Sequence, residues 1–223
     1  MYFQARQLLV QFLAKQKNRI VDALDTPRDL KRFVSANKAS KDILILRIIS
    51  TEALKMKQLL SCSDILFVLS ALSKSGKTFN REIFANFKDK MVFDSPHMSV
   101  TDLSQLLYYY VESVDAMDVS FVKDLLGAAK NSDPSKGAFL DWKRLLTVIT
   151  KSGISDRDII KHCCEGLATQ VESISSRDAV DVLECLLALN VNHNGLVSAI
   201  NLKAAKMTGD STVLKSLLFK FTR

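Results

Sequence analysis

The side chains best suited to metal binding or to nucleophilic catalysis are few in this chain of 223 residues, and their spacing supports neither chemistry. None of the three histidines, His97, His162 and His193, stands at a metal-ligand spacing from a cysteine or from another histidine. Cys163 and Cys164 directly follow His162, but three consecutive residues of a helix point in different directions and cannot bind one ion. We therefore expect no metal site and no cofactor.

One segment resembles part of a phosphate-binding loop, which would imply nucleotide chemistry. Ser75-Gly-Lys-Thr78 matches the end of such a loop, but Ala71 stands where the motif needs a glycine, and no strand precedes it. A turn at the end of a helix explains the segment better. Because no nucleophile elbow, dinucleotide fingerprint or paired-acid pocket signature is present either, we expect no enzymatic activity and no small-molecule substrate.

Binding of a polyanion is better supported, because basic residues are concentrated at both ends of the sequence. The net charge is +7; residues 1–60 hold 12 basic and 5 acidic side chains, residues 61–200 hold 14 and 18, and residues 201–223 hold 5 and 1. Contacts with phosphate groups are therefore expected at the two ends. The candidates are Lys15, Lys17, Arg19, Lys31, Arg32, Lys203, Lys206, Lys215 and Lys220. The alternative, that these side chains only solvate exposed helix faces, stays open for each of them.

Three consecutive tyrosines form the densest aromatic cluster of the sequence. An exposed tyrosine can stack on a nucleic-acid base, so Tyr108 and Tyr109 are candidates for base stacking. Tyr110 falls on the apolar stripe described below, and we expect it to pack in the core.

The elements that must position these residues follow from a repeated tetrad, a hydroxyl residue three positions before an aspartate. Such a hydroxyl accepts a hydrogen bond from a free backbone N–H at the start of a helix, where the acid also faces the positive end of the helix dipole. The aspartates of successive copies are 35, 38, 39 and 37 residues apart. The copies are Thr26-x-x-Asp29, Ser61-x-x-Asp64, Ser99-x-x-Asp102, Ala138-x-x-Asp141, which lacks the hydroxyl, and Ser175-x-x-Asp178.

Apolar residues recur one, four, five and, in all copies but the first, eight positions after each aspartate, which is the spacing of one buried helix stripe. A second apolar segment follows in every unit, so each unit of 35–39 residues is predicted to form a pair of helices. Such pairs bury their apolar faces by stacking. We therefore predict an all-α protein: one α-solenoid domain over 1–223, with a leading helix in 1–25, about five helical hairpins in 26–207 and a capping helix in 208–223. No apolar run approaches the roughly 18 residues of a membrane span, so the chain is not expected to cross a membrane.

The segments SSRDAVDVLECLLAL (175–189) and TDLSQLLY (101–108) are similar to the first helices of heptatricopeptide and octotricopeptide repeats. These helical repeats occur in organellar RNA-binding proteins related to the FAST-kinase-domain and RAP-domain proteins. The resemblance covers about residues 26–207, lacks the Pro-Pro-Pro-Glu-Trp box of octotricopeptide repeats, and is not followed by a RAP domain. It implies a mitochondrial protein, located in the matrix, that binds RNA or belongs to a ribonucleoprotein such as the mitochondrial ribosome.

Three functional hypotheses remain open at this point. In the first, the basic ends bind RNA, in particular ribosomal RNA, while the more acidic middle contacts neighbouring proteins of a large assembly. In the second, the chain is a protein-binding scaffold, for example an accessory subunit of a mitochondrial membrane complex such as ATP synthase. A cytosolic repeat adaptor is the third. The first 21 residues hold four basic residues and no acid, which resembles an organellar transit peptide and favours a mitochondrial location.

Overall fold

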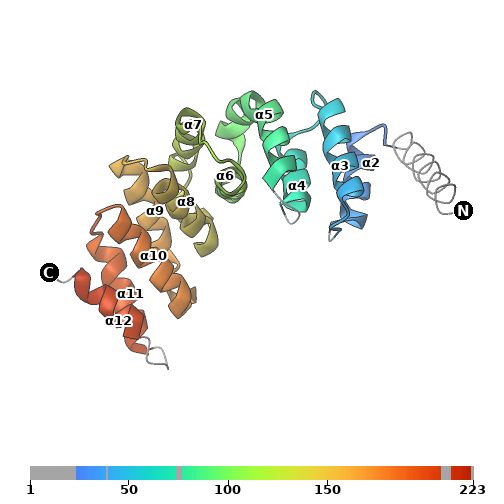
Figure 1. Ribbon diagram of the computed structural model, residues 1–223. Helices are drawn as coiled ribbons and strands as arrows, with labels where there is room; N and C mark the ends of the chain where they lie inside the picture. Colours follow the sequence, from blue (N-terminus) through green and yellow to red (C-terminus); the bar gives the residue numbers. More distant parts are fainter. Residues whose placement is uncertain (1–23, 39, 74–76, 207–211, 222–223) are drawn as a thin grey trace, which may run out of the picture. The chain divides into compact units, whose positions relative to one another are not determined.

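The computed structural model describes residues 24–38, 40–73, 77–206 and 212–221, and their regular secondary structure is entirely helical (Figure 1). The prediction of an all-α protein is confirmed for this part of the chain. The leading helix expected in 1–25 lies outside the described residues except for Leu24 and Asp25, which precede the first described helix. None of the described helices is both long enough and apolar enough to cross a membrane.

The α-helices differ in length from nine to 18 residues. Three short 3-10 helices, at Ser95–His97, Pro134–Lys136 and Val171–Ser173, lie in the connections between them. The bounds of the α-helices are α2 Pro27–Ala36, α3 Ile43–Lys55, α4 Cys62–Leu72, α5 Lys77–Asp94, α6 Val100–Ser113, α7 Val119–Lys130, α8 Phe139–Ser152, α9 Arg157–Thr169, α10 Ser176–Ala188, α11 Asn194–Lys206 and α12 Thr212–Lys220.

The repeated tetrads begin helices, as their sequence predicts. In each of the four copies with a hydroxyl, the side chain accepts a hydrogen bond from the backbone N–H of the aspartate, at 3.1–3.3 Å. These copies begin α2, α4, α6 and α10. At the start of α8, where Ala138 has no hydroxyl, the Asp141 carboxylate instead accepts a hydrogen bond from the Ala138 N–H at 3.1 Å. The acid therefore stabilises the helix start even where the hydroxyl is missing.

The contacts of the chain cluster in two compact units, one that ends at Lys90 and one that begins at Met91. In the first unit α2, α3 and α4 contact one another. Leu30 and Val34 of α2, Ile49 of α3 and Leu69 of α4 are fully buried in this unit. The single repeat domain expected over 1–223 stays a prediction.

In the second unit the helices lie in two rows, which Figure 1 shows by their labels. The first helices of three successive pairs form one row, in which α8 contacts both α6 and α10. The second helices form the other, in which α9 contacts both α7 and α11, and α12 packs on α10 and α11. The residues of the predicted apolar stripe are buried between the rows: Leu103, Leu106, Leu107, Tyr110, Trp142, Leu145, Leu146, Ile149, Ala179, Val182, Leu183 and Leu186.

Trp142 is the largest buried side chain of the second unit, and two glycines make room for it. A Cβ atom added at Gly137 or at Gly166 would overlap the indole ring. The ring also packs edge-on against His162, with 5.3 Å between ring centres. The close approach of backbone to indole fixes how α8 sits against α9.

Candidate binding grooves

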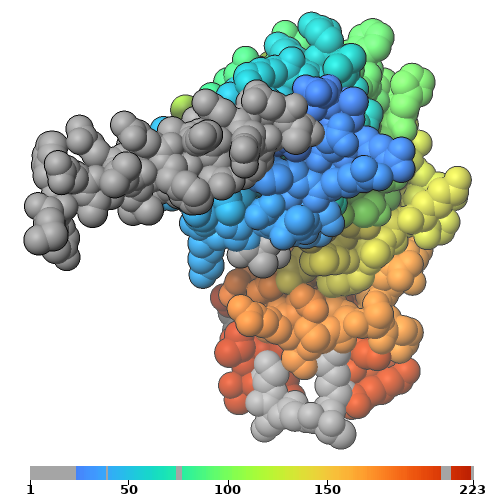
Figure 2. Space-filling model, turned by 90° about the vertical axis from the view of Figure 1, so that its right-hand side faces the viewer, coloured from blue at the N-terminus to red at the C-terminus, as the bar shows by residue number. Residues whose placement is uncertain are grey.

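The basic residues predicted near the beginning of the chain have different environments. Lys15, Lys17 and Arg19 lie outside the described residues. Lys31 forms an ion pair with Asp64 on α4, so its charge is already compensated within the first unit. Arg32 is mostly exposed, and its nearest carboxylate, that of Asp29, is 4.0 Å away. Both side chains belong to α2, whose surface is blue in Figure 2.

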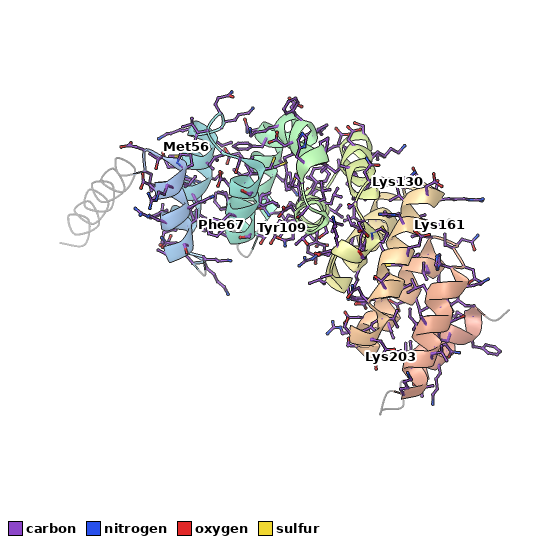
Figure 3. The ribbon with its side chains drawn as sticks, turned by 180° about the vertical axis from the view of Figure 1, so that it is seen from behind. Met56, Phe67, Tyr109, Lys130, Lys161 and Lys203 are labelled. Carbon is purple, nitrogen blue, oxygen red and sulfur yellow. The ribbon has the colours of Figure 1, made fainter. Side chains whose placement is uncertain are left out.

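The two predicted lysines of α11 also differ. Lys203 donates hydrogen bonds to the backbone oxygen of Glu172 at 2.6 Å and to its carboxylate at 3.3 Å, and only about a fifth of its side chain is exposed (21%). Lys206 is exposed in the last turn of the helix. Figure 3 shows the position of Lys203 on α11. Of these two lysines, Lys206 is the one open to a phosphate group.

A groove of about 580 Å³ in the second unit runs across the row of first helices. We call it the first groove. Its charged and aromatic lining comes from three helices: Tyr108 and Glu112 of α6, Lys143, Arg144 and Lys151 of α8, and Asp181 and Glu184 of α10. Three cations on the central helix therefore lie between carboxylates on the two flanking helices.

Lys143 is held by two carboxylates of α10. Its Nζ lies 2.6 Å from Asp178 Oδ1 and 2.6 Å from Asp181 Oδ2. Partial burial disfavours the charged ammonium, but the hydrogen bonds to the two aspartates outweigh it, and the pKa of Lys143 is raised. In return, the hydrogen bond from Lys143, followed by that from Ser175, lowers the pKa of Asp178.

The other two cations of the first groove are also engaged. Lys151 forms an ion pair with Glu112 on α6. The Arg144 guanidinium lies 3.6 Å from Asp141 Oδ1 and 5.8 Å from the centre of the Tyr108 ring. Glu184 is exposed and has no ion-pair partner in the described part of the chain. A polyanion entering this groove would have to displace carboxylates, which makes the first groove a poor site for RNA phosphates.

Sequence analysis missed one recurring contact between successive hairpins. The residue two positions after a tetrad aspartate donates to the tetrad aspartate of the next hairpin: Lys31 to Asp64, Ser104 to Asp141, and Lys143 to Asp178. We call these contacts the hairpin ties. A usable signal was present, since Lys31 and Lys143 occupy equivalent positions, and each precedes the next tetrad aspartate by two residues fewer than the length of its repeat.

The three tyrosines have separate roles. Tyr108 is half-buried in the first groove beneath Arg144, and Tyr109 is half-buried without lining that groove (Figure 3). Tyr110 is buried, accepts a hydrogen bond from the Asp118 N–H at 2.9 Å, and packs edge-on against Phe121. The expectation that Tyr110 belongs to the core is confirmed.

Lys215 and Lys220 line two neighbouring depressions at α12. The larger one, about 360 Å³, lies between α11 and α12; we call it the second groove. It is lined by Asn192, Asn194, Ser198, Asn201, Lys215 and Phe219, together with Val197, Leu218 and Phe221. The smaller one, about 170 Å³, contains Lys220 and Asn190 and shares Asn192 and Phe221 with the second groove. The structure thus brings two predicted cations to one surface.

The side chains best suited to metal binding or to nucleophilic catalysis are used by the fold or are buried. Among the described residues, no cluster of three histidine, cysteine or acidic side chains is placed to bind a metal ion. His193 Nδ1 accepts a hydrogen bond from the Leu196 N–H at 3.1 Å, at the start of α11. Burial raises the pKa of Cys163, and it raises that of Cys164 to about 12, so both thiols stay protonated at neutral pH.

No model of a known protein family matches the sequence, and no curated protein matches it. The similarity to heptatricopeptide and octotricopeptide repeats therefore stays a prediction drawn from the segments quoted above.

Proposed function

We propose that this chain is a non-catalytic helical-repeat protein of a mitochondrial matrix ribonucleoprotein, such as the mitochondrial ribosome. In this proposal the five hairpins of 26–207 form one α-solenoid. The first groove holds a segment of a neighbouring protein, and the basic ends of the chain contact RNA.

The observation that carries this proposal is the difference between the charged residues that line the two grooves. In the first groove, the lysines Lys143 and Lys151 have carboxylate partners on a neighbouring helix. The described lining of the second groove and of the depression beside it contains Lys215 and Lys220 and no acidic residue. Phosphate groups are therefore attracted to the second surface, whereas the first suits a partner that carries charges of both signs.

The solenoid part of the proposal is supported by repeated packing. In the second unit, equivalent helices follow one another from α6 to α8 to α10, and the hairpin ties join successive pairs. Stacking in this way buries the apolar stripe that a single hairpin would leave exposed.

A protein segment is the expected occupant of the first groove because the groove combines paired charges with apolar contacts. Leu140 at its edge is 49% exposed, and Cys185 and Ala188 line it from α10. Glu184 offers a carboxylate to a basic side chain of the partner. Charged groups of this kind set the specificity and the rate of association more than the affinity.

The proposal is tested by measuring the affinity of the full chain for a fluorescent RNA at several salt concentrations. A protein that uses about four to six phosphates of single-stranded RNA should show a slope of log K against log salt of about −3 to −4. Failure to bind at low salt would reject the RNA part and leave a protein-binding scaffold, such as an accessory subunit of a mitochondrial membrane complex.

The protein-binding part is tested by recovering the tagged chain from mitochondria with and without nuclease treatment. We expect neighbouring proteins to remain bound after the RNA is digested and Glu184→Lys to reduce their recovery. The matched control is Asp124→Lys, which reverses an exposed acid on α7, outside the first groove. Equal recovery with both variants would contradict the assignment of the first groove, and absence of the tagged full-length chain from mitochondria would reject the location.

A further inference from the structure

The repeat places three different side chains across the middle of the first groove. Tyr108 on α6, Thr147 on α8 and Glu184 on α10 each stand six residues after a tetrad aspartate, and all three line the groove. Because α8 contacts both α6 and α10, a ligand that lies in the groove meets all three helices. From one wall to the other it encounters a phenol ring, a hydroxyl and a carboxylate.

The negative charges at the first groove outnumber the positive ones. All three cations of α8 have a carboxylate within 4.0 Å, and Lys143 has two. These carboxylates belong to Glu112, Asp141, Asp178 and Asp181. The exposed Glu184, which has no ion-pair partner among the described residues, is the fifth carboxylate for three cations. A ligand of this groove therefore brings positive charge, and Glu184 is the group left to receive it.

The α10 wall becomes apolar directly beyond Glu184. Cys185, which is partly exposed, and Ala188, which is exposed, line the groove from the same face of the helix. Ala188 is four residues after Glu184, about 6 Å along the helix axis, or one turn. A ligand whose cation pairs with Glu184 thus meets an apolar surface one helical turn away.

The first groove offers few hydrogen-bonding groups to the backbone of an extended peptide. The hydroxyls of Thr147 and Thr150 donate within α8, to the backbone oxygens of Lys143 and Leu146, both at 2.9 Å. The cations of the groove are engaged by carboxylates, and its walls are helices whose backbone groups bond to one another. An extended chain buried here would leave N–H and C=O groups without partners, whereas a helix satisfies its own. A helix also packs well against helices, because its ridges fit the grooves between their side chains.

We propose that the first groove binds an amphipathic helix of a partner protein, in which a lysine or arginine stands one turn from a large apolar residue. The basic side chain pairs with Glu184, and the apolar side chain packs on Cys185 and Ala188. The inference rests on the protein-binding part of the proposed function and adds the secondary structure and the residue pattern of the partner. An RNA strand or an acidic helix does not fit, because its negative charges would meet the excess of carboxylates.

The test begins with a selection of helix-stabilised 14-residue peptides from a randomised library against the full chain. We expect the enriched peptides to carry lysine or arginine three or four residues from leucine, isoleucine, methionine or phenylalanine. The tightest peptide is then titrated by fluorescence anisotropy. Glu184→Gln should weaken its binding by about 2- to 5-fold through the loss of one partly exposed ion pair. Alanine in place of the apolar residue of the peptide should weaken it by about 10- to 100-fold.

An exchange of charges identifies the contact itself. Glu184→Lys should bind the selected peptide more weakly than the unaltered chain does, and a peptide whose basic residue is changed to glutamate should recover binding to Glu184→Lys. The matched control is Asp124→Asn, which removes an exposed acid from α7 outside the first groove and should leave the affinity unchanged. Circular dichroism melting of each variant verifies that the fold is kept.

The inference is overturned if no peptide is enriched, if the enriched peptides lack a basic residue, or if Glu184→Gln binds them as tightly as Asp124→Asn does. The proposed function is decided separately, by the recovery of neighbouring proteins from mitochondria. If Glu184→Lys reduces that recovery while the peptide selection fails, the first groove remains a protein site and only the helical pattern of the partner is wrong.

Discussion

Ser104 on α6 donates a hydrogen bond to Asp141 on α8 at 3.0 Å, from the position that Lys143 occupies when it donates to Asp178 one hairpin later. Three of the five tetrad aspartates, Asp64, Asp141 and Asp178, therefore have two roles. Each stabilises the start of its own helix, and each receives the hairpin tie from the preceding pair. A neutral hydroxyl, at 3.0 Å, and a charged ammonium, at 2.6 Å, both make this contact.

Replacement of Asp141 by alanine should lower the free energy of unfolding by about 2 to 4 kcal/mol, because buried donors lose their acceptor. The carboxylate is buried and accepts from Ser104, from Thr101 at 2.7 Å and from the Ala138 N–H. Urea unfolding followed by circular dichroism measures the loss. Asp124→Ala, an exposed change on α7, should stay within about 0.5 kcal/mol of the unaltered chain, and a similar loss in both variants would contradict the account.

Substitution by alanine should have opposite effects on stability at a glycine that contacts Trp142 and at a glycine with free space around it. Gly166→Ala forces a methyl group into the indole ring and should destabilise the fold by about 1 to 3 kcal/mol. Gly127→Ala on α7 meets no atom within 4 Å and should stabilise it by roughly 0.5 to 1 kcal/mol, since alanine favours the helix. Thermal melting compares the two variants. A shift of the melting temperature in the same direction for both would contradict the close packing of the Gly166 backbone against the indole ring.

The tie between Lys143 and Asp178 should make part of the free energy of unfolding depend on pH. Because the folded-state pKa of Asp178 lies below its unfolded value of about 3.9, this contribution is present above that pH and is lost as the pH falls through the lower, folded value. Lys143→Met should therefore be less stable than the unaltered chain at pH 7, and the difference should shrink below about pH 4. Urea unfolding from pH 3 to pH 7 measures this.

The control for the pH series is Lys161→Met on α9, where an exposed lysine lies 3.8 Å from Glu165 (Figure 3). An exposed pair of this kind contributes about 0 to 1 kcal/mol, so the variant should follow the unaltered chain at every pH. A pH-independent difference for Lys143→Met would show that the tie does not titrate with the aspartate.

Cys185 should be the one cysteine that reacts rapidly in the folded protein. It is partly exposed in the first groove, whereas Cys62, Cys163 and Cys164 are buried. Maleimide labelling followed by mass spectrometry should modify Cys185 first, and a protein bound in the first groove should slow its labelling. Equal labelling of Cys163 or Cys164 in the native chain would contradict the burial of α9, and undiminished labelling of Cys185 in the complex would place the partner elsewhere.

The local part of this fold could be predicted from the sequence, since a helix start depends on residues three positions apart. Thr26 and Asp29, for example, identify the beginning of α2 without any knowledge of its neighbours. The buried stripe followed in the same way from helical spacing. The hairpin ties did not, because Lys31 and Asp64 meet only when two hairpins pack in one register. Lys31 was therefore interpreted as a phosphate contact, although its ammonium is paired.

Of the candidate site, only the charged residues could be predicted from the sequence. Lys215 and Lys220 stand out in a basic segment of the sequence, so their part in a binding surface could be expected. Asn201 and Phe219 could not, because an amide carries no charge and an exposed ring has the same spacing as a buried one. They come together only through the packing of α12 on α11.

The most direct test of the account compares the binding of single-stranded RNA by Lys215→Ala/Lys220→Ala and by Lys143→Met. The account predicts that the double variant loses about 5- to 20-fold in affinity and that its salt slope falls by about 1.4, since each phosphate of a single strand contributes about 0.7. Lys143→Met should bind RNA as the unaltered chain does. Equal losses in both variants, or a loss confined to Lys143→Met, would contradict the assignment of RNA to the end of the chain and of protein to the first groove.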